Sequence, residues 1–441
     1  MSSLRHGLSA YAGMIRLFSR NVWLVLLFGI GSGLTFGVFL FTFNFYVLSL
    51  GGAYDEAFLG TLQSAASFAT IAMALPAAWL AQRYSPKWVM IAAGLIGAVS
   101  YGGLVLFPMQ PALIGFRMLA GVAMSLGSVA VAPFLMANTG PRERQWAFSF
   151  QAGLSTVASF FGNLLAGILP GRLGAMAGVG PTDTLAYQLT LGSMVALSAL
   201  SVAPLFFIRA APRKAMTRPE RPWVQVKRYA PLFARFLLPS LVIGLGAGLM
   251  QPFMNVYFRH VYEKPDPAIG VVFALGGLAM AVGQFIGPPM ADRLGKIRTV
   301  MLTQALSIPF LITLGLGAWL VPNGIVAAGT FFVLAGVAYI FRLALMNLSN
   351  PVYQTFVLER VPSEAQALSV SLTNLVFQVG WFIMPQVSGR LQVTHGPSGF
   401  TYVFAGVTVL YITAILLERW FFGAEARDEA AERPLAAVSG S

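Results

Sequence analysis

Arg342 lies near the middle of an apolar segment, residues 325–358, where a charged side chain needs a polar partner or a cavity. At 3.6 residues per turn, other polar side chains fall on or beside its face: Ser349, Asn350, Tyr353, Asn347 and Gln354. A guanidinium in such surroundings makes short, charge-assisted hydrogen bonds. The group therefore predicts either an anchor for a carboxylate, phosphate or sulfate, or a tether between helices.

Other apolar segments carry smaller polar sets. Arg117 follows Gly115-Phe116, near the outer end of its segment. Gln251 and Asn255 share one helical face, and Asn374 and Gln378 share another. Amide pairs at this spacing suit hydrogen bonding to a ligand, so we predict these residues, with those around Arg342, to contact a substrate.

Acidic residues are expected outside the middle of these segments. Glu359 is placed at a segment end and Asp292 in a loop, and the three His are also placed outside. A proton relay inside a membrane uses buried titratable side chains, so proton coupling is disfavoured, with protonation of Glu359 or of a bound solute as the alternative. The chain has no Cys and no recognisable catalytic or phosphate-binding motif. We therefore expect no enzyme activity, no cofactor and no metal site.

The elements that hold these residues follow from composition. The chain is 57% hydrophobic and 10% charged over 441 residues, with a mean hydropathy of +0.74. Its apolar runs are continuous and about 20 or more residues long, whereas a transmembrane barrel shows ten-residue alternation. We predict an all-α membrane protein with twelve transmembrane helices. The predicted spans are 22–49, 57–80, 88–109, 112–137, 147–168, 185–208, 233–257, 267–290, 299–320, 325–358, 366–388 and 398–422.

Two sets of small residues predict close helix packing. One is the glycine-rich run from Gly244 to Gly248, which lies in an apolar helix with no strand before it and so is no nucleotide-binding loop. The other is the small, polar stripe of Gln151, Ser155, Ser159 and Gly162.

The net charge of +13 is distributed unevenly. With the N-terminus taken as cytoplasmic, four of the 28 Lys and Arg fall on external segments, two lie inside helices and the remaining 22 are cytoplasmic. This imbalance predicts that both termini are cytoplasmic. We expect a multi-pass protein of the cell (plasma or inner) membrane. The basic loops then set its orientation in the bilayer and do not indicate nucleic-acid binding.

The chain divides into two similar halves. Residues 1–208 and 233–422 are each predicted to form a six-helix bundle, separated by a basic, proline-containing cytoplasmic linker at 209–232 and followed by a disordered tail at 423–441. Short matches relate the halves, such as Asn44-Phe-Tyr46 with Asn255-Val-Tyr257. Repeated six-helix units are typical of transporters.

Ala291-Asp292-Arg293-Leu294-Gly295-Lys296 resembles the cytoplasmic signature loop of the major facilitator superfamily. The equivalent loop of the first half keeps Arg83 but has Gln82 where that family has Asp. The resemblance implies two six-helix pseudo-repeats and a gating role for Asp292 and Arg293, and more weakly for Arg83. It also implies transport by alternating access.

We therefore predict a monomeric secondary transporter of a small organic solute, either anionic or polar and amphipathic. Drug or lipid-like efflux is the transport alternative. A non-transporting sensor or a lipid scramblase on the same fold is the alternative of a different class.

Overall fold

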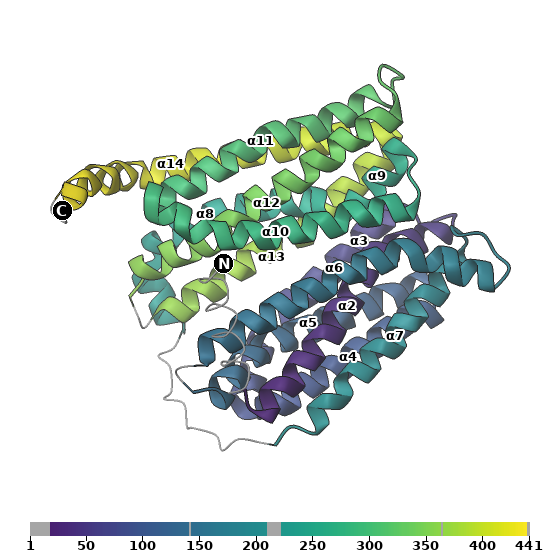
Figure 1. Ribbon diagram of the computed structural model, residues 1–441, viewed down its shortest axis with the longest axis horizontal. Helices are drawn as coiled ribbons and strands as arrows, with labels where there is room; N and C mark the ends of the chain where they lie inside the picture. Colours follow the sequence, from purple (N-terminus) through teal and green to yellow (C-terminus); the bar gives the residue numbers. More distant parts are fainter. Residues whose placement is uncertain (1–17, 141–142, 210–221, 363–364, 439–441) are drawn as a thin grey trace, which may run out of the picture. The chain divides into compact units, whose positions relative to one another are not determined.

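The computed structural model describes residues 18–140, 143–209, 222–362 and 365–438, and within these ranges the chain is helical and contains no strand. The helices of the N-terminal half are α2 Arg20–Ser49, α3 Glu56–Arg83, α4 Pro86–Leu106, α5 Gln110–Asn138, α6 Arg144–Met176 and α7 Thr184–Phe206. Those of the C-terminal half are α8 Pro222–Met250, η1 Gln251–Phe253, α9 Met254–Tyr262, α10 Asp266–Leu294, α11 Lys296–Leu320, α12 Ala328–Arg360, α13 Gln366–His395, η3 Gly396–Ser398 and α14 Gly399–Val438 (Figure 1).

The described residues contain eleven helical runs long and apolar enough to cross a membrane. The last run, Leu368–Glu425, holds both α13 and α14, which are joined through the turn η3. At that turn Gly396 has a φ of 59°, a conformation that glycine adopts without steric cost. Counting α13 and α14 separately gives the twelve helices predicted from the sequence.

The seventh predicted helix, 233–257, is interrupted in the structure. Helix α8 ends at Met250, and a 3₁₀ turn leads from it into the short helix α9. Pro252 lies in this turn and has no backbone N–H to donate to the preceding turn, so the regular hydrogen-bond ladder stops there.

Helices extend into two segments that the sequence suggested to be irregular. Helix α8 begins at Pro222, inside the predicted linker 209–232, while residues 210–221 lie outside the described residues. Helix α14 continues to Val438, whereas the sequence suggested a disordered tail from residue 423.

The chain forms two compact units. Among the described residues, the first comprises 18–50 and 68–209 and the second comprises 51–67 and 222–438, so the beginning of α3 belongs with the C-terminal helices. Glycines explain this grouping, because a Cβ on Gly60 or Gly389 would overlap the backbone of the facing helix. The first turns of α3 therefore pack directly on α13.

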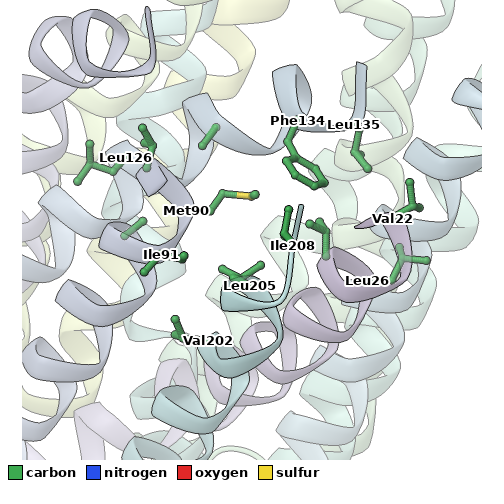
Figure 2. Packing of buried hydrophobic residues seen from close by; sticks show 14 of the residues in the cluster. Val22, Leu26, Met90, Ile91, Leu126, Phe134, Leu135, Val202, Leu205 and Ile208 are labelled. Carbon is green, nitrogen blue, oxygen red and sulfur yellow. The ribbon is translucent and has the colours of Figure 1, made fainter. Parts of the chain in front are cut away.

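The first unit has an apolar core between α2, α4, α5 and α7, with Val22, Met90, Phe134 and Leu205 among its buried residues (Figure 2). Helix α2 also packs along α6. A Cβ on Gly33 would lie 2.6 Å from the Ser155 carbonyl oxygen, and one on Gly162 would lie 2.5 Å from that of Leu34. The small-residue stripe of the fifth predicted helix is thus a packing surface, as predicted.

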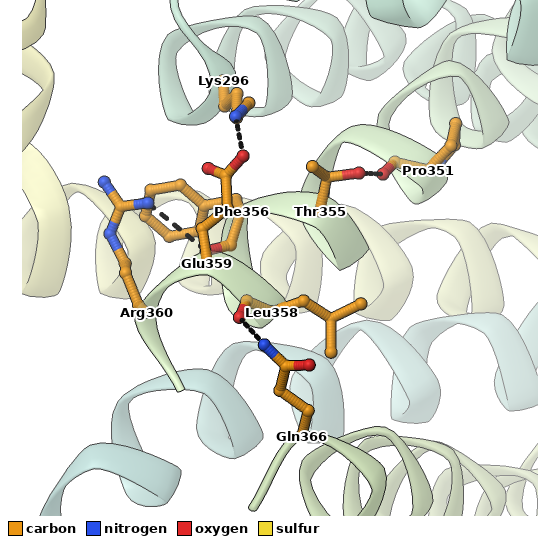
Figure 3. Close-up of polar contacts among 8 residues, drawn as sticks. All are labelled: Lys296, Pro351, Thr355, Phe356, Leu358, Glu359, Arg360 and Gln366. Carbon is orange, nitrogen blue, oxygen red and sulfur yellow. Dashed lines mark hydrogen bonds and ion pairs between the residues drawn. The ribbon is translucent and has the colours of Figure 1, made fainter. Parts of the chain in front are cut away.

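In the second unit α8 packs on α13 and α14, while α12 packs on α10 and α11. Polar contacts hold the end of α12 (Figure 3). Glu359 pairs with Lys296 at the start of α11, and Gln366 donates to the Leu358 carbonyl at 2.8 Å. The Arg360 guanidinium lies 3.6 Å from the Phe356 ring centroid and pairs with Glu425 of α14 at 2.6 Å.

Candidate functional site

The second unit contains a cavity of about 330 Å³ among α8, α11, α12 and α13. Eight of its lining residues carry hydroxyl or amide groups: Ser240, Gln304, Ser349, Asn350, Tyr353, Gln354, Thr373 and Asn374. The other five are apolar: Ile243, Met346, Val357, Val370 and Phe377. The lining residues are therefore uncharged and offer both hydrogen bonds and apolar contacts.

Helix α12 supplies the largest share of the wall because its lining residues recur every three or four positions. The Ser349 hydroxyl donates to the Met346 carbonyl at 2.8 Å, so it is turned back along its own helix. The Asn350 amide donates to the Asn347 side-chain oxygen at 3.1 Å. That bond orients Asn350 and leaves its own side-chain oxygen available as an acceptor.

Tyr353 joins α12 to α8. Its hydroxyl donates to the Phe236 carbonyl at 2.9 Å, while its ring packs beside Phe356. This bond fixes the side chain that separates the cavity from the apolar cluster behind it, so Tyr353 shapes the wall.

Behind Gln304 lies a carboxyl group that the sequence analysis did not place in the interior. Glu418 of α14 is fully buried and accepts a hydrogen bond of 3.1 Å from the Gln304 side-chain nitrogen. The expectation that no acidic side chain lies well inside a helix is wrong at this position. Glu418 stands four residues before the predicted helix end at 422, but α14 continues to Val438, which places Glu418 within the helix.

Arg342 is also buried, with 1% of its surface exposed, but it lies one turn away from Met346 and is not part of the cavity wall. Its Nη2 donates to the Tyr411 hydroxyl of α14 at 2.8 Å, and the guanidinium stands 5.4 Å from the centroid of that ring. Gly246 of α8 leaves room for the Tyr411 ring, because a Cβ there would overlap it. Arg342 therefore connects α12 to α14.

Four of the predicted binding residues line the cavity together: Asn350, Tyr353, Gln354 and Asn374. Asn347 lies beside it and donates to the Leu343 carbonyl at 2.8 Å. Gln378 stands one turn beyond Asn374, outside the wall.

The remaining amides lie in the broken seventh helix. Gln251 is half-buried in η1. Asn255 is buried at the start of α9, where its side-chain oxygen accepts from the Val256 N–H at 3.0 Å. The prediction that the pair shares one helical face assumed a continuous helix, which the 3₁₀ turn interrupts.

Arg117 belongs to the first unit. It is half-buried on α5, and its guanidinium lies 5.9 Å and 5.1 Å from the ring centroids of Phe39 and Phe43 on α2. These distances are in the range of cation–π contacts, so aromatic faces of α2 help accommodate this charge.

The predicted gating residues lie at helix ends. Asp292 and Arg293 are exposed in the last turn of α10, followed by Gly295 with a φ of 95°. That backbone conformation favours glycine and permits the tight turn into α11. Arg83 is the last residue of α3, and its guanidinium lies 5.2 Å from the Trp79 ring centroid.

Sequence reasoning missed Ser240, Gln304, Thr373 and Glu418. Gln304 and Glu418 could have been noticed as rare amide and carboxyl groups in apolar helices. Ser240 and Thr373 gave no comparable signal, because single hydroxyls are common in membrane helices and often bond their own backbone. Thr373 does so here, donating to the Ser369 carbonyl at 2.9 Å.

Comparison with known proteins adds an independent observation. The multi-drug resistance efflux pump PmrA of Streptococcus pneumoniae is 26% identical over 273 residues, a match spanning 60% of this chain and 65% of the pump. A Bacillus subtilis protein named for metabolite transport, YwtG, is 22% identical over 442 residues, covering 91% of each chain. A crystal structure of the nucleoside transporter NupG superposes with a TM-score of 0.73 at 15% identity, covering 91% of this chain and 99% of that one.

The NupG likeness shows the same helical fold. The sequence model of the Major Facilitator Superfamily matches residues 24–385, which include the signature loop after α10 and nearly all of the cavity-bearing helices. Together with the long apolar helices, this makes the protein an integral, multi-pass membrane protein of a transporter family. The chain belongs to the Major Facilitator Superfamily.

Proposed function

We propose that the protein is a secondary transporter that binds a small, polar, amphipathic organic solute in the cavity of its second unit and moves it by alternating access. The observation that carries this proposal is the composition of the cavity wall. It combines amide and hydroxyl groups with Met346, Phe377 and other apolar side chains, and no charged residue is among those that line it. A solute that has both hydrogen-bonding groups and apolar surface can use both kinds of side chain.

The same wall favours an amphipathic solute over an anionic one. The guanidinium that would attract an anion, that of Arg342, lies outside the wall and bonds Tyr411. The ionisable group that contacts the lining residue Gln304 is the acid Glu418, which is not a cation. An anion placed in the cavity would therefore lack a cation at the wall.

Drug efflux is the second candidate. The likeness to PmrA, which is named as a multi-drug pump, favours it, and so does the part of the wall formed by Met346 and Phe377. Methionine and aromatic side chains adapt to varied apolar shapes. The cavity amides should contribute strongly to binding of a polar, amphipathic solute. They should contribute little to binding of a drug, because a drug held by its apolar surface needs few hydrogen bonds.

A thermal-stability screen on purified protein separates these classes. The panel contains nucleosides, pentoses, neutral amphipathic drugs and aliphatic carboxylates. A ligand at about 100 times its dissociation constant adds roughly 2.7 kcal/mol to stability, a readily measured shift. Stabilising compounds are then tested for counterflow in proteoliposomes. Stabilisation by carboxylates alone would contradict the proposal, and saturable binding without flux would indicate a sensor.

Asn374→Leu tests whether the cavity amides bind the solute. It removes one hydrogen-bonding group from the wall at similar volume, which costs about 0.5–1.5 kcal/mol of binding, or roughly two- to tenfold in affinity. Gln378→Leu, one turn along the same helix and outside the wall, is the matched control and should change affinity less than twofold. Isothermal titration with a compound found in the screen measures both. Equal effects of the two variants would place the solute elsewhere.

Asp292→Asn tests the proposed gate. An exposed ion pair contributes about 0.2–1 kcal/mol, so the variant should slow transport by roughly two- to fivefold and leave solute affinity unchanged. Glu359→Gln is the control, because Glu359 is an exposed acid that pairs with Lys296 beside the same turn between α10 and α11. Parallel loss of affinity and flux in Asp292→Asn would assign the residue to binding or folding.

A further inference from the structure

Glu418 is a fully buried carboxyl group in α14, which packs against α8 and α11. Its Oε1 accepts the bond from Gln304, and its Oε2 has no hydrogen-bond partner among the described residues. Both oxygens of an ionised carboxylate require donors or a cation when water is excluded, and leaving them unpaired is costly.

The groups that face Glu418 do not supply a cation. From α12 the facing titratable group is Tyr353, whose hydroxyl is committed to the Phe236 carbonyl. From α11 it is the neutral Gln304, and α13 has no ionisable residue before Arg390. The neighbouring basic residues, Arg235 on α8 and Arg419 on α14, are exposed. Within the described chain, no Lys, Arg or His forms an ion pair with Glu418.

Two of these neighbours also line the cavity. Gln304 donates to the carboxyl and is also part of the cavity wall, and Tyr353, whose hydroxyl interacts electrostatically with Glu418, lines the wall from α12. When the cavity holds water, its polarisable contents stabilise a negative charge on Glu418. When a neutral group displaces that water, the charged form loses this stabilisation and the protonated form is favoured.

We propose that Glu418 is a proton-binding site, that it is a neutral carboxylic acid in this conformation, and that its proton affinity rises when the neighbouring cavity is filled. The step is the addition of one proton to Oε2 of the carboxylate, with no other bond changed. By thermodynamic reciprocity a neutral ligand then binds more tightly when Glu418 is protonated. This linkage, the coupling between proton binding and cavity occupancy, rests on the proposed function, because it matters only if a solute binds in the cavity. Proton binding at Glu418 does not depend on the proposed function.

Infrared spectroscopy of the full chain in nanodiscs tests the site without any transported solute. The wild type should show the carbonyl stretch of a protonated carboxylic acid at neutral pH, sensitive to deuterium oxide. Glu418→Gln should remove this band, whereas Glu359→Gln, which alters an exposed acid, should leave it. If Glu418→Gln does not fold, Glu418→Asp should keep the band and shift its frequency. A wild-type spectrum without such a band would overturn the proposal.

The linkage is tested by filling the cavity covalently. The chain has no Cys, so Asn350→Cys provides a single labelling site on the wall, and benzyl methanethiosulfonate attaches a neutral aromatic group there. Labelling should raise the pH at which the Glu418 band disappears by about one unit, a tenfold gain in proton affinity. Thr313→Cys, half-buried on α11 and outside the cavity wall, is labelled as the control and should give no shift.

An unchanged titration in labelled Asn350→Cys would overturn the linkage. Because neither measurement requires transport, a failure of the proton site is distinguishable from a failure of the proposed function. A protein that carries a solute but lacks the band contradicts only the former.

Discussion

Gly380→Ala is expected to destabilise the second unit by about 3 kcal/mol or more, or to prevent its folding. A Cβ at Gly380 would overlap the carbonyl group of Gly244 and the N–H of Leu245 on α8. These are backbone atoms, which cannot rotate aside as a flexible side chain can. Helices α8 and α13 would have to separate, and both supply cavity residues, Ser240 from α8 and Thr373 from α13.

The control is Gly277→Ala on α10, where an added Cβ would meet no atom within 4 Å. There alanine should be neutral or slightly stabilising, because glycine costs a helix interior up to about 1 kcal/mol relative to alanine. Thermal unfolding of both variants in the same detergent measures the difference. Similar melting temperatures for the two variants would show that α8 and α13 tolerate a wider separation, and the account of their packing would be wrong.

Thr373→Trp is expected to abolish solute binding, lowering affinity at least about a hundredfold while leaving the protein folded. An indole is far larger than the threonine side chain, buries about 150–250 Å² of surface, and would project into the cavity of about 330 Å³. It would compete directly with a solute against Asn374 and Phe377. The substitution enters an existing space, so its effect should fall on binding more than on folding.

Thr313→Trp on α11 is the matched control. Both threonines donate to the carbonyl four residues earlier at 2.9 Å, but Thr313 is half-buried and lies outside the cavity wall. Its indole should therefore leave binding unchanged. Ligand-dependent thermal shift and proteoliposome counterflow report the two effects. Normal counterflow by folded Thr373→Trp would exclude this cavity as the site.

The glycine-rich run in α8 shows how far local pattern can reach. The sequence predicts that Gly244 and its neighbours pack against another helix, because small residues in an apolar helix allow close approach. The structure confirms this and identifies the partner as α13, where a Cβ on Gly244 would lie 2.7 Å from the Phe377 carbonyl oxygen. The pattern gives the existence of the contact, and only the fold gives its partner.

Arg342 and Glu418 show what local pattern does not predict, namely which distant residues a side chain contacts. The sequence analysis left Arg342 as either a ligand anchor or a tether between helices, and the structure directs its Nη2 to Tyr411, sixty-nine residues away. It expected acidic residues to lie outside the middle of the apolar segments, and the structure buries Glu418 against Gln304, 114 residues away. Helical periodicity relates residues three or four positions apart, but carries no information about which face of another helix meets them.

By itself, then, the sequence determined that this protein spans a lipid bilayer, how many helices it has and roughly where they begin and end, and to which family it belongs. These follow from hydropathy, length and local motifs, which depend on neighbouring residues. The tertiary structure alone decided that Asn350, Tyr353, Gln354 and Asn374 share a cavity with Ser240, Gln304 and Thr373. It also decided that Arg342 lies outside the cavity wall and that the Glu418 carboxyl group contacts the wall residue Gln304. The reason is that helix rotation and pairing are set by packing between distant segments.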